Sequence, residues 1–309
     1  MPNFYYGGQA VIEGVMMRGR GQATVVVRKR DGSLIARTEL IPSALAHSNA
    51  ARFPFVRGLV ALWEMLVLGM RMMLYSVNVQ AQSDLGQEIP RGLLASMLAL
   101  SITLAVGVFF VLPLLLSSAA GHIIHGSLAT NALEGVLRLV LFLGYLSLLS
   151  RAERMKRVFQ YHGAEHKTVN AFEHGAELTP ESVKRFSVIH VRCGTAFLLW
   201  VVVISIFVFA LLGHPPLAEG VVLRIVLVPL VAAVSYELLR LGATYYHLAP
   251  VRWIVQPGLW LQRLTTREPS LDQIEVAIAA LQPVLTADGV PLTAPEVNVS
   301  QCRPSPTTA

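Results

Sequence analysis

A short segment near the middle of the chain carries the residues best suited to metal chemistry. It contains the pattern His-x-x-Glu-His, formed by His162, Glu165 and His166. Residues four apart on a helix face the same side, so the two imidazoles can bind one divalent ion while the carboxylate acts on a bound water molecule. Zinc is the metal we expect, because a zinc-bound water ionises near neutral pH. Glu165 is then the predicted catalytic base of a hydrolytic site.

A catalytic zinc ion takes three protein ligands, so the two histidines need a partner from elsewhere in the chain. Glu237 is a candidate because it is an ionisable residue near the end of an apolar segment. His190 and Cys193 precede one apolar segment as His-x-x-Cys, and His247 follows another. Each also has a structural explanation. Glu237 can pair with Arg240, the cysteine can simply fill space, and the histidines can bind backbone or lipid phosphates.

Composition indicates that these residues belong to a membrane protein. The chain has 309 residues, of which 54% are hydrophobic and only 14% charged, whereas a soluble domain carries about 25% charged residues. This argues against a single soluble globular enzyme and excludes a disordered or fibrous chain. The predicted fold is mainly α and polytopic, with four transmembrane helices. The predicted spans are Leu93–Ser118, with Pro113 as a kink, Leu133–Ser150, Thr195–Leu212 and Val221–Leu241.

The distribution of basic residues predicts the orientation of these spans. Residues 1–92 hold ten Lys and Arg, residues 151–192 hold eight and residues 240–309 hold five, whereas 119–132 and 213–220 hold none. The positive-inside rule therefore places both termini and the central loop in the cytoplasm. With the lipid bilayer as its surroundings, the chain is expected in the bacterial cytoplasmic (inner) membrane.

Residues 56–74 form a further apolar segment, interrupted by Arg57, Glu64 and Arg71. These three lie seven apart and form one charged stripe on a helix. We therefore expect an amphipathic helix that lies at the interface or against the bundle, although a fifth span remains an alternative.

The remaining segments predict small cytoplasmic elements. Ala23–Lys29 and Leu34–Ile41 read as strands joined at Asp31-Gly32, so the N-terminal region is a small β-element. Ser270 and Gln273 form a capping box that opens an amphipathic helix through Leu281. The predicted organisation is a β-element (1–50), an amphipathic helix (51–80), a first hairpin (92–150), a central loop (151–192), a second hairpin (193–241), a C-terminal segment with a helix (242–282) and a disordered tail (283–309).

The two hairpins share a pattern that predicts a tandem duplication. The first reads Glu134, Arg138 and then Tyr161-His162, and the second reads Glu219, Arg224 and then Tyr246-His247. Two apolar hairpins can look alike by composition alone, but the matched spacing of polar residues favours a repeat. A repeat places His162 and His247 at corresponding positions.

Several long motifs resemble the YqhQ-like family of bacterial membrane proteins. They are GGQAVIEGVMMRG (7–19), RFPFVRGL (52–59), YHGAEHKTVNAFEHG (161–175), HVRCGTAF (190–197) and PGLWLQRLTTREPSLDQIEVAIAAL (257–281). The resemblance implies an inner-membrane protein of the kind labelled a predicted metal-dependent enzyme. The His-x-x-Glu-His pattern is also similar to that of the inverzincin peptidases, whose downstream glutamate would correspond to Glu237.

Three functions follow as hypotheses. The first is a membrane metallohydrolase that acts on a peptide or a lipid. The second is a non-enzymatic factor whose basic cytoplasmic face, with net charges of +4 over 1–92 and +3 over 151–192, docks a ribosome, a translocation machine or anionic lipid, without recognising a nucleic acid sequence. The third is a small transporter, which four spans would support only as a homo-oligomer.

Overall fold

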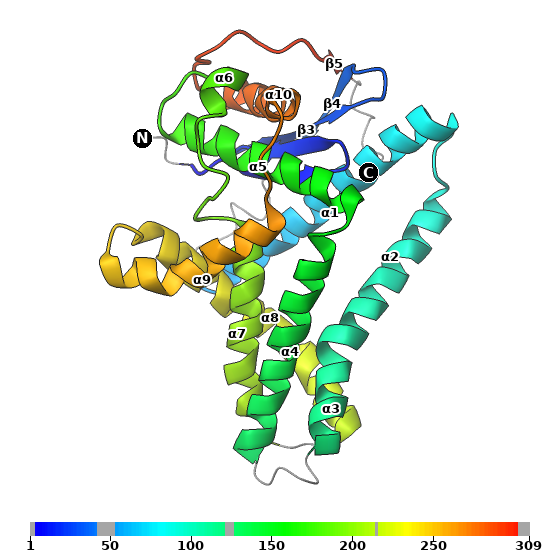
Figure 1. Ribbon diagram of the computed structural model, residues 1–309, viewed down its shortest axis with the longest axis vertical. Coiled ribbons are helices and arrows are strands. Elements are labelled where there is room, and N and C mark those ends of the chain that lie inside the picture. Colours follow the sequence, from blue (N-terminus) through cyan, green and yellow to red (C-terminus); the bar gives the residue numbers. More distant parts are fainter. Residues whose placement is uncertain (1–3, 42–52, 121–126, 214–215, 302–309) are drawn as a thin grey trace.

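The computed structural model describes residues 4–41, 53–120, 127–213 and 216–301. It contains a lobe built on a β-sheet and, below it, a bundle of long apolar helices (Figure 1). The mainly helical fold and the small N-terminal sheet agree with the prediction.

The sheet is an N-terminal meander with one strand added from the far end of the chain. Its strands are β1 (Gly7–Val11), β2 (Gly14–Arg18), β3 (Gln22–Arg28), β4 (Leu34–Leu40) and β5 (Ser300–Gln301), in that spatial order. The first four pair antiparallel, and β5 pairs parallel with β4. The turn between β3 and β4 contains Gly32 at φ 83°, so the hairpin predicted at Asp31-Gly32 is confirmed.

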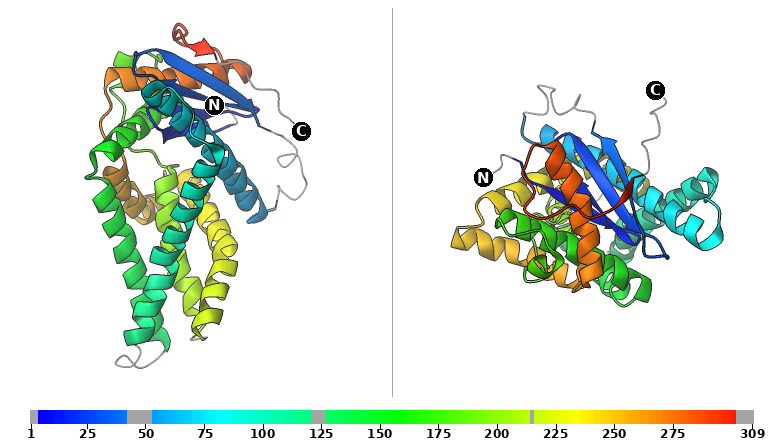
Figure 2. Two further views of the ribbon diagram at one scale, coloured as in Figure 1. Left: turned by 90° about the vertical axis from the view of Figure 1, so that its right-hand side faces the viewer. Right: turned by 90° about the horizontal axis from the view of Figure 1, so that it is seen from above.

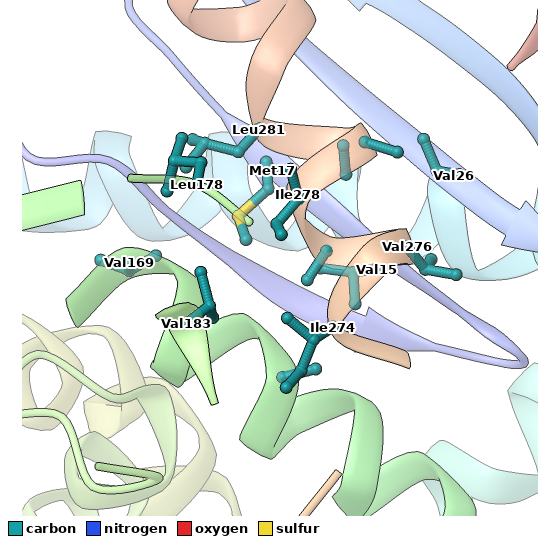
Figure 3. Packing of buried hydrophobic residues seen from close by; sticks show 14 of the residues in the cluster. Val15, Met17, Val26, Val169, Leu178, Val183, Ile274, Val276, Ile278 and Leu281 are labelled. Carbon is teal, nitrogen blue, oxygen red and sulfur yellow. The ribbon is translucent and has the colours of Figure 1, made fainter. Parts of the chain in front are cut away.

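Helices cover both faces of this sheet (Figure 2). They are α1 (Val56–Leu85) on one face and α5 (Glu153–Glu173), α10 (Leu271–Ala287) and the short α6 (Pro180–Val183) on the other. Side chains alternate between the faces along a strand. Val15, Met17 and Val26 pack toward α5 and α10 (Figure 3), whereas Met16 and Val25 pack toward α1. The capping box at Ser270 and Gln273 is present at the start of α10, as predicted.

The bundle lies below the lobe. It comprises α2 (Arg91–Val106), the π-helical η2 (Gly107–Val111), α3 (Leu112–Ala120), α4 (Ser127–Leu149), α7 (Gly194–Ala210) and α8 (Leu217–Thr244), with α9 (Ala249–Thr265) lying where bundle and lobe meet (Figure 1). Among the described residues, four helices are long and apolar enough to cross a membrane: Val56–Leu85, Arg91–Ala120, Ala129–Leu149 and Ala218–Thr244. Three of these are predicted spans. The fourth predicted span, Thr195–Leu212, corresponds to α7, an apolar helix of only 17 residues. The fourth candidate by length is instead α1.

The charged stripe of α1 shows how this helix is held. Arg57 pairs with Glu237 of α8 at 2.5 Å. Glu64 pairs with an arginine of β2 at 2.8 Å, and Arg71 lies 3.9 Å from a glutamate of β4. Gly69 packs against a side chain of β1 as well. The polar face of α1 therefore lies against the sheet and α8, which fits the prediction of a helix lying against the bundle.

The π-helical segment has a local cause. Pro113 has no N–H to donate to the carbonyl of Phe109, four residues earlier, and its ring clashes with that carbonyl in a regular helix. Arg138 of α4 supplies the missing donor, since its Nε lies 2.9 Å from the Phe109 oxygen. The irregularity predicted at Pro113 thus occurs one turn earlier, and the carbonyl it exposes is paired with a side chain.

Arg138 also belongs to a buried ionic cluster between the hairpins. Glu134 accepts from Arg138 at 2.6 Å and from Arg224 of α8 at 2.8 Å and 2.5 Å. All three side chains are nearly inaccessible to solvent. Both guanidinium groups lie over the ring of Phe209, at 4.9 Å and 5.5 Å from its centroid. Ser205 accepts a further bond from Arg138 at 3.1 Å. One carboxylate therefore joins two hairpins.

Glu219, which the repeat pattern matches to Glu134, is exposed at the start of α8 and does not join this cluster. The duplication and the orientation in the membrane stay predictions.

The C-terminal tail differs from the prediction of disorder from Pro283. Helix α10 continues through Pro283 to Ala287, and Val290, Leu292 and Val297 pack against the core of the lobe. Gln282 anchors the returning chain, because its side chain bonds the carbonyl of residue 295 and the amide of residue 297. The Pro-rich composition of this segment indicates disorder, but the segment also contains apolar residues that are spaced to cover this core. Residues 302–309, with Cys302, lie outside the described residues.

Candidate metal centre

Helix α5 presents His162, Glu165 and His166 from adjacent turns, as the spacing predicts. The two imidazole rings lie with their centroids 4.4 Å apart, and Glu165 and His166 are buried. The third member of the cluster is Cys193, the N-cap residue of α7, whose Sγ lies 3.4 Å from His162 Nε2. One ligand atom from each of His162, His166 and Cys193 lies within 4.8 Å of the other two.

Backbone carbonyls fix the tautomers of both histidines. His162 Nδ1 lies 2.8 Å from the Thr265 oxygen, and His166 Nδ1 lies 2.6 Å from the Val188 oxygen. A carbonyl oxygen can only accept, so both Nδ1 atoms carry hydrogen and donate. In the neutral rings Nε2 is then free to act as a ligand. Histidines that bind metals are commonly oriented by this type of outer contact.

The electrostatics favour a thiolate at the cluster. Burial opposes ionisation of the Cys193 thiol, but His166 and His162 outweigh it and hold its pKa well below the usual range. Burial likewise opposes a charge on His166, yet Cys193 raises its pKa to about 9. Burial lowers the pKa of His190 to about 4, which keeps that ring neutral. Without a metal, His166 is therefore the imidazolium partner of the thiolate. It must release a proton to bind a divalent ion, because thiolate and neutral imidazole are the forms that bind such metals.

A cavity of about 70 Å³ adjoins the three candidate ligands, which is room for at least one water molecule. Gly7, Gly8 and Glu165 line it. The amide of Gly8 donates to Glu165 Oε1 at 3.0 Å, and Glu165 Oε2 lies 3.5 Å from His166 Nε2. A Cβ on Gly8 would lie 1.9 Å from a carbonyl oxygen of β2, so glycine is required where β1 approaches the carboxylate.

Sequence reasoning missed the side chains that hold the segment leading to Cys193. Lys167 Nζ donates to the carbonyls of residues 184 and 186, both at 2.7 Å, and Asn170 donates to those of residues 187 and 189. Gln262 of α9 bonds both the amide and the carbonyl of His190, at 3.0 Å and 2.8 Å. Polar residues on one face of α5 beside the motif were the available signal, since such groups need partners when buried.

The structure does not bring all six predicted ligands together. His190 is next to the cluster, with its ring centroid 5.7 Å from that of His166, and its Nε2 lies 3.3 Å from Glu173. Glu237 is bound by Arg57, and His247 is exposed in the turn between α8 and α9. Neither Glu237 nor His247 belongs to the three-residue cluster of the described residues. The third candidate ligand is therefore Cys193 and not Glu237.

Gly163 shows how the linker after α9 is seated on the motif. A Cβ at this position would lie 2.1 Å from the carbonyl oxygen of Arg267, and the Arg267 amide donates to the Phe159 carbonyl at 2.9 Å. Glycine has a low helix propensity, but at position 163 it allows the linker to cross α5 closely. This crossing places the Thr265 carbonyl beside His162.

Gly163→Ala is expected to lower the free energy of unfolding by about 1–2 kcal/mol, because overpacking costs about 1–3 kcal/mol and the gain in helix propensity returns at most about 1 kcal/mol. Gly144→Ala in α4 is the matched control, since a Cβ there meets nothing within 4 Å. Chemical unfolding in detergent measures both. Equal stability of the two variants would contradict the tight crossing.

Comparison with known proteins gives a family. Residues 53–287 match a family described as proteins of unknown function, DUF1385. The chain is also 34% identical over 301 residues to the uncharacterised protein YqhQ of Bacillus subtilis strain 168, which covers 92% of this chain and 93% of that protein. The chain belongs to this family. The resemblance indicated by the sequence motifs is therefore confirmed. No solved structure matches.

Proposed function

We propose that this protein is a metal-dependent hydrolase of the bacterial cytoplasmic membrane, with zinc held by His162, His166 and Cys193. The observation that carries the proposal is the cluster itself: three potential ligand atoms within 4.8 Å, two of them on rings oriented by backbone carbonyls. Three protein ligands with an open position are typical of catalytic zinc, whereas structural zinc takes four.

The residues around the open position suit hydrolysis. A bound zinc would lower the pKa of a water molecule and polarise the bond to be cleaved. Glu165 adjoins the cavity in which that water would lie, and the Gly8 amide fixes its carboxylate. It is placed to remove the proton from the water and to return it to the leaving group. His190 and Arg192, which also line the cavity, are placed to bind an anionic or polar substrate group.

The location in the cytoplasmic membrane is part of the proposal. Four apolar helices fit a membrane protein, and α4 is followed at once by the basic residues Arg151, Arg154, Lys156 and Arg157. The positive-inside rule then orients the sheet lobe and the metal centre toward the cytoplasm.

The proposal predicts separate effects on metal content and on turnover. Protein purified in detergent without chelators is expected to hold close to one zinc per chain. Glu165→Gln is expected to keep the metal but to lower hydrolysis by about 10²–10⁴-fold, the contribution of a general base. Elemental analysis and an assay with extracted lipids and peptides as substrates measure the two. A zinc-free wild type would contradict the proposal, and so would full activity in Glu165→Gln.

A second candidate is favoured by the contact of Cys193 with His162 at 3.4 Å. A thiolate beside an imidazole at a helix N-terminus is also the arrangement of a cysteine nucleophile. Metal-free protein that hydrolyses substrate and loses activity on alkylation of Cys193 would favour this alternative. A biological function that survives His162→Ala with His166→Ala would instead favour the docking factor.

A further inference from the structure

A second cavity, of about 540 Å³, opens next to the candidate metal centre. It lies between the end of α5, residues 187–191 and α9. Its size falls within the range of about 300–1,000 Å³ that is typical of ligand pockets. His190 lines both this groove and the smaller cavity, so a molecule in the groove lies against the wall of the metal centre.

Helix α9, which forms one side of the groove, has the character of an interfacial helix. Trp253, Ile254 and Trp260 expose 79%, 59% and 56% of their surfaces, whereas Val255 and Leu259 on the other face are buried. The helix lies where the bundle meets the lobe (Figure 1). Exposed tryptophans on an amphipathic helix at this level are typical of the lipid head-group region. Trp260 also lines the groove, so the groove opens toward lipid.

The charges in the groove favour an anionic ligand. Glu173, its acidic residue, is already paired with Arg192 and lies 3.3 Å from the neutral ring of His190. Arg263 lines the groove, is exposed, and forms no side-chain hydrogen bond or ion pair with any of the described residues. Polar side chains such as Asn170 and Gln256 complete the wall beside apolar ones. A free guanidinium next to an apolar opening is complementary to a phosphate that carries acyl chains.

We propose that this groove binds an anionic phospholipid, with its phosphate at Arg263 and its acyl chains along Trp260. Resting on the proposed function, an ester of such a lipid is the substrate class of the hydrolase. Hydrolysis adds the hydroxyl of water to the acyl carbon or phosphorus atom, breaks the bond from that atom to the alcohol oxygen, and leaves the second proton on that oxygen.

Tryptophan quenching tests the groove without requiring activity. Variants that keep only Trp260 or only Trp253 are placed in phosphatidylcholine nanodiscs with a minor fraction of acyl-brominated phosphatidylglycerol or acyl-brominated phosphatidylcholine. For Trp260 we expect about fivefold more effective quenching by phosphatidylglycerol, the factor that corresponds to about 1 kcal/mol per basic side chain. Trp253, which does not line the groove, is expected to show no such preference.

Matched arginine variants on α9 show whether the groove causes the preference. Arg263→Gln is expected to abolish it, whereas Arg252→Gln, an exposed arginine outside the groove lining, is expected to leave it intact. Equal quenching of Trp260 by the two lipids would overturn the proposal, and so would a preference that survives Arg263→Gln.

The same measurement separates this proposal from the proposed function. If the wild type is purified without zinc but still shows the preference, the groove is supported, and the absence of zinc contradicts the hydrolase. Zinc-loaded protein that binds phosphatidylglycerol selectively but leaves it intact overturns the substrate class, whereas its cleavage, lost in Arg263→Gln, supports it.

Discussion

Cys193→Ala is expected to lower the affinity for zinc by more than about 100-fold, because even contacts to the outer shell of a zinc site contribute about 10–100-fold. The remaining ligands, His162 and His166, cannot satisfy a tetrahedral ion from one helix alone. Their Nδ1 bonds to backbone carbonyls do not involve Cys193, so we expect both rings to keep their orientation in this variant. Competition with a chromogenic chelator in detergent measures the affinity.

The chain offers a matched control for this experiment. His247 is the counterpart of His162 in the predicted duplication, but it is exposed and lies outside the cluster. His247→Ala is therefore expected to bind zinc as the wild type does, whereas His166→Ala is expected to behave like Cys193→Ala. Wild-type affinity in Cys193→Ala would show that the cysteine is not a ligand. A loss in His247→Ala would show that the site is built differently.

Glu134→Gln is expected to lower the free energy of unfolding by about 3–5 kcal/mol, the cost of breaking a buried ion pair by removing one partner. In this variant Arg138 and Arg224 keep their charges within hydrogen-bond distance of one neutral amide. The carbonyls of residues 109 and 220, which also accept from them, cannot neutralise two cations. Unfolding in detergent micelles measures the change.

Two further variants make this result specific. Glu219→Gln removes an exposed carboxylate at the start of α8 and is expected to change the stability by less than about 0.5 kcal/mol. Adding Arg224→Leu to Glu134→Gln is expected to recover part of the loss, since one buried cation is removed. Equal stability of the two single variants would contradict the role of the cluster in joining the hairpins.

Much of the site could be predicted from local spacing. The interval between His162 and His166 fixes their common side on any helix, and the two residues do converge. Which distant residue joins them could not be predicted, because it depends on how Lys167, Asn170 and Gln262 hold the segment before Cys193. The polar side chains that make these bonds are visible in the sequence, but the backbone carbonyls and amides that they bind are not.

The fold shows the same division between local and distant information. The run Val25-Val26-Val27 is typical of a strand buried on both faces, and both faces are in fact covered. Periodicity does not say that α1 covers one face and α10 the other. The charged stripe of α1 gave a better clue, because buried or half-buried charges require partners of opposite sign. For Arg57 this partner is Glu237.

The candidate metal centre draws on both ends of the chain, and this constrains its biogenesis. Glu165 is held by Gly8 of the first strand, and His162 by the carbonyl of Thr265 at the end of α9. During synthesis the histidines of α5 leave the ribosome before Cys193, all of α7 and α8, and Thr265. The three ligands and the carbonyl that orients His162 are thus present together only after the second hairpin has been made. Metal loading would then be a late event in maturation, reserved for chains whose membrane topology is already correct.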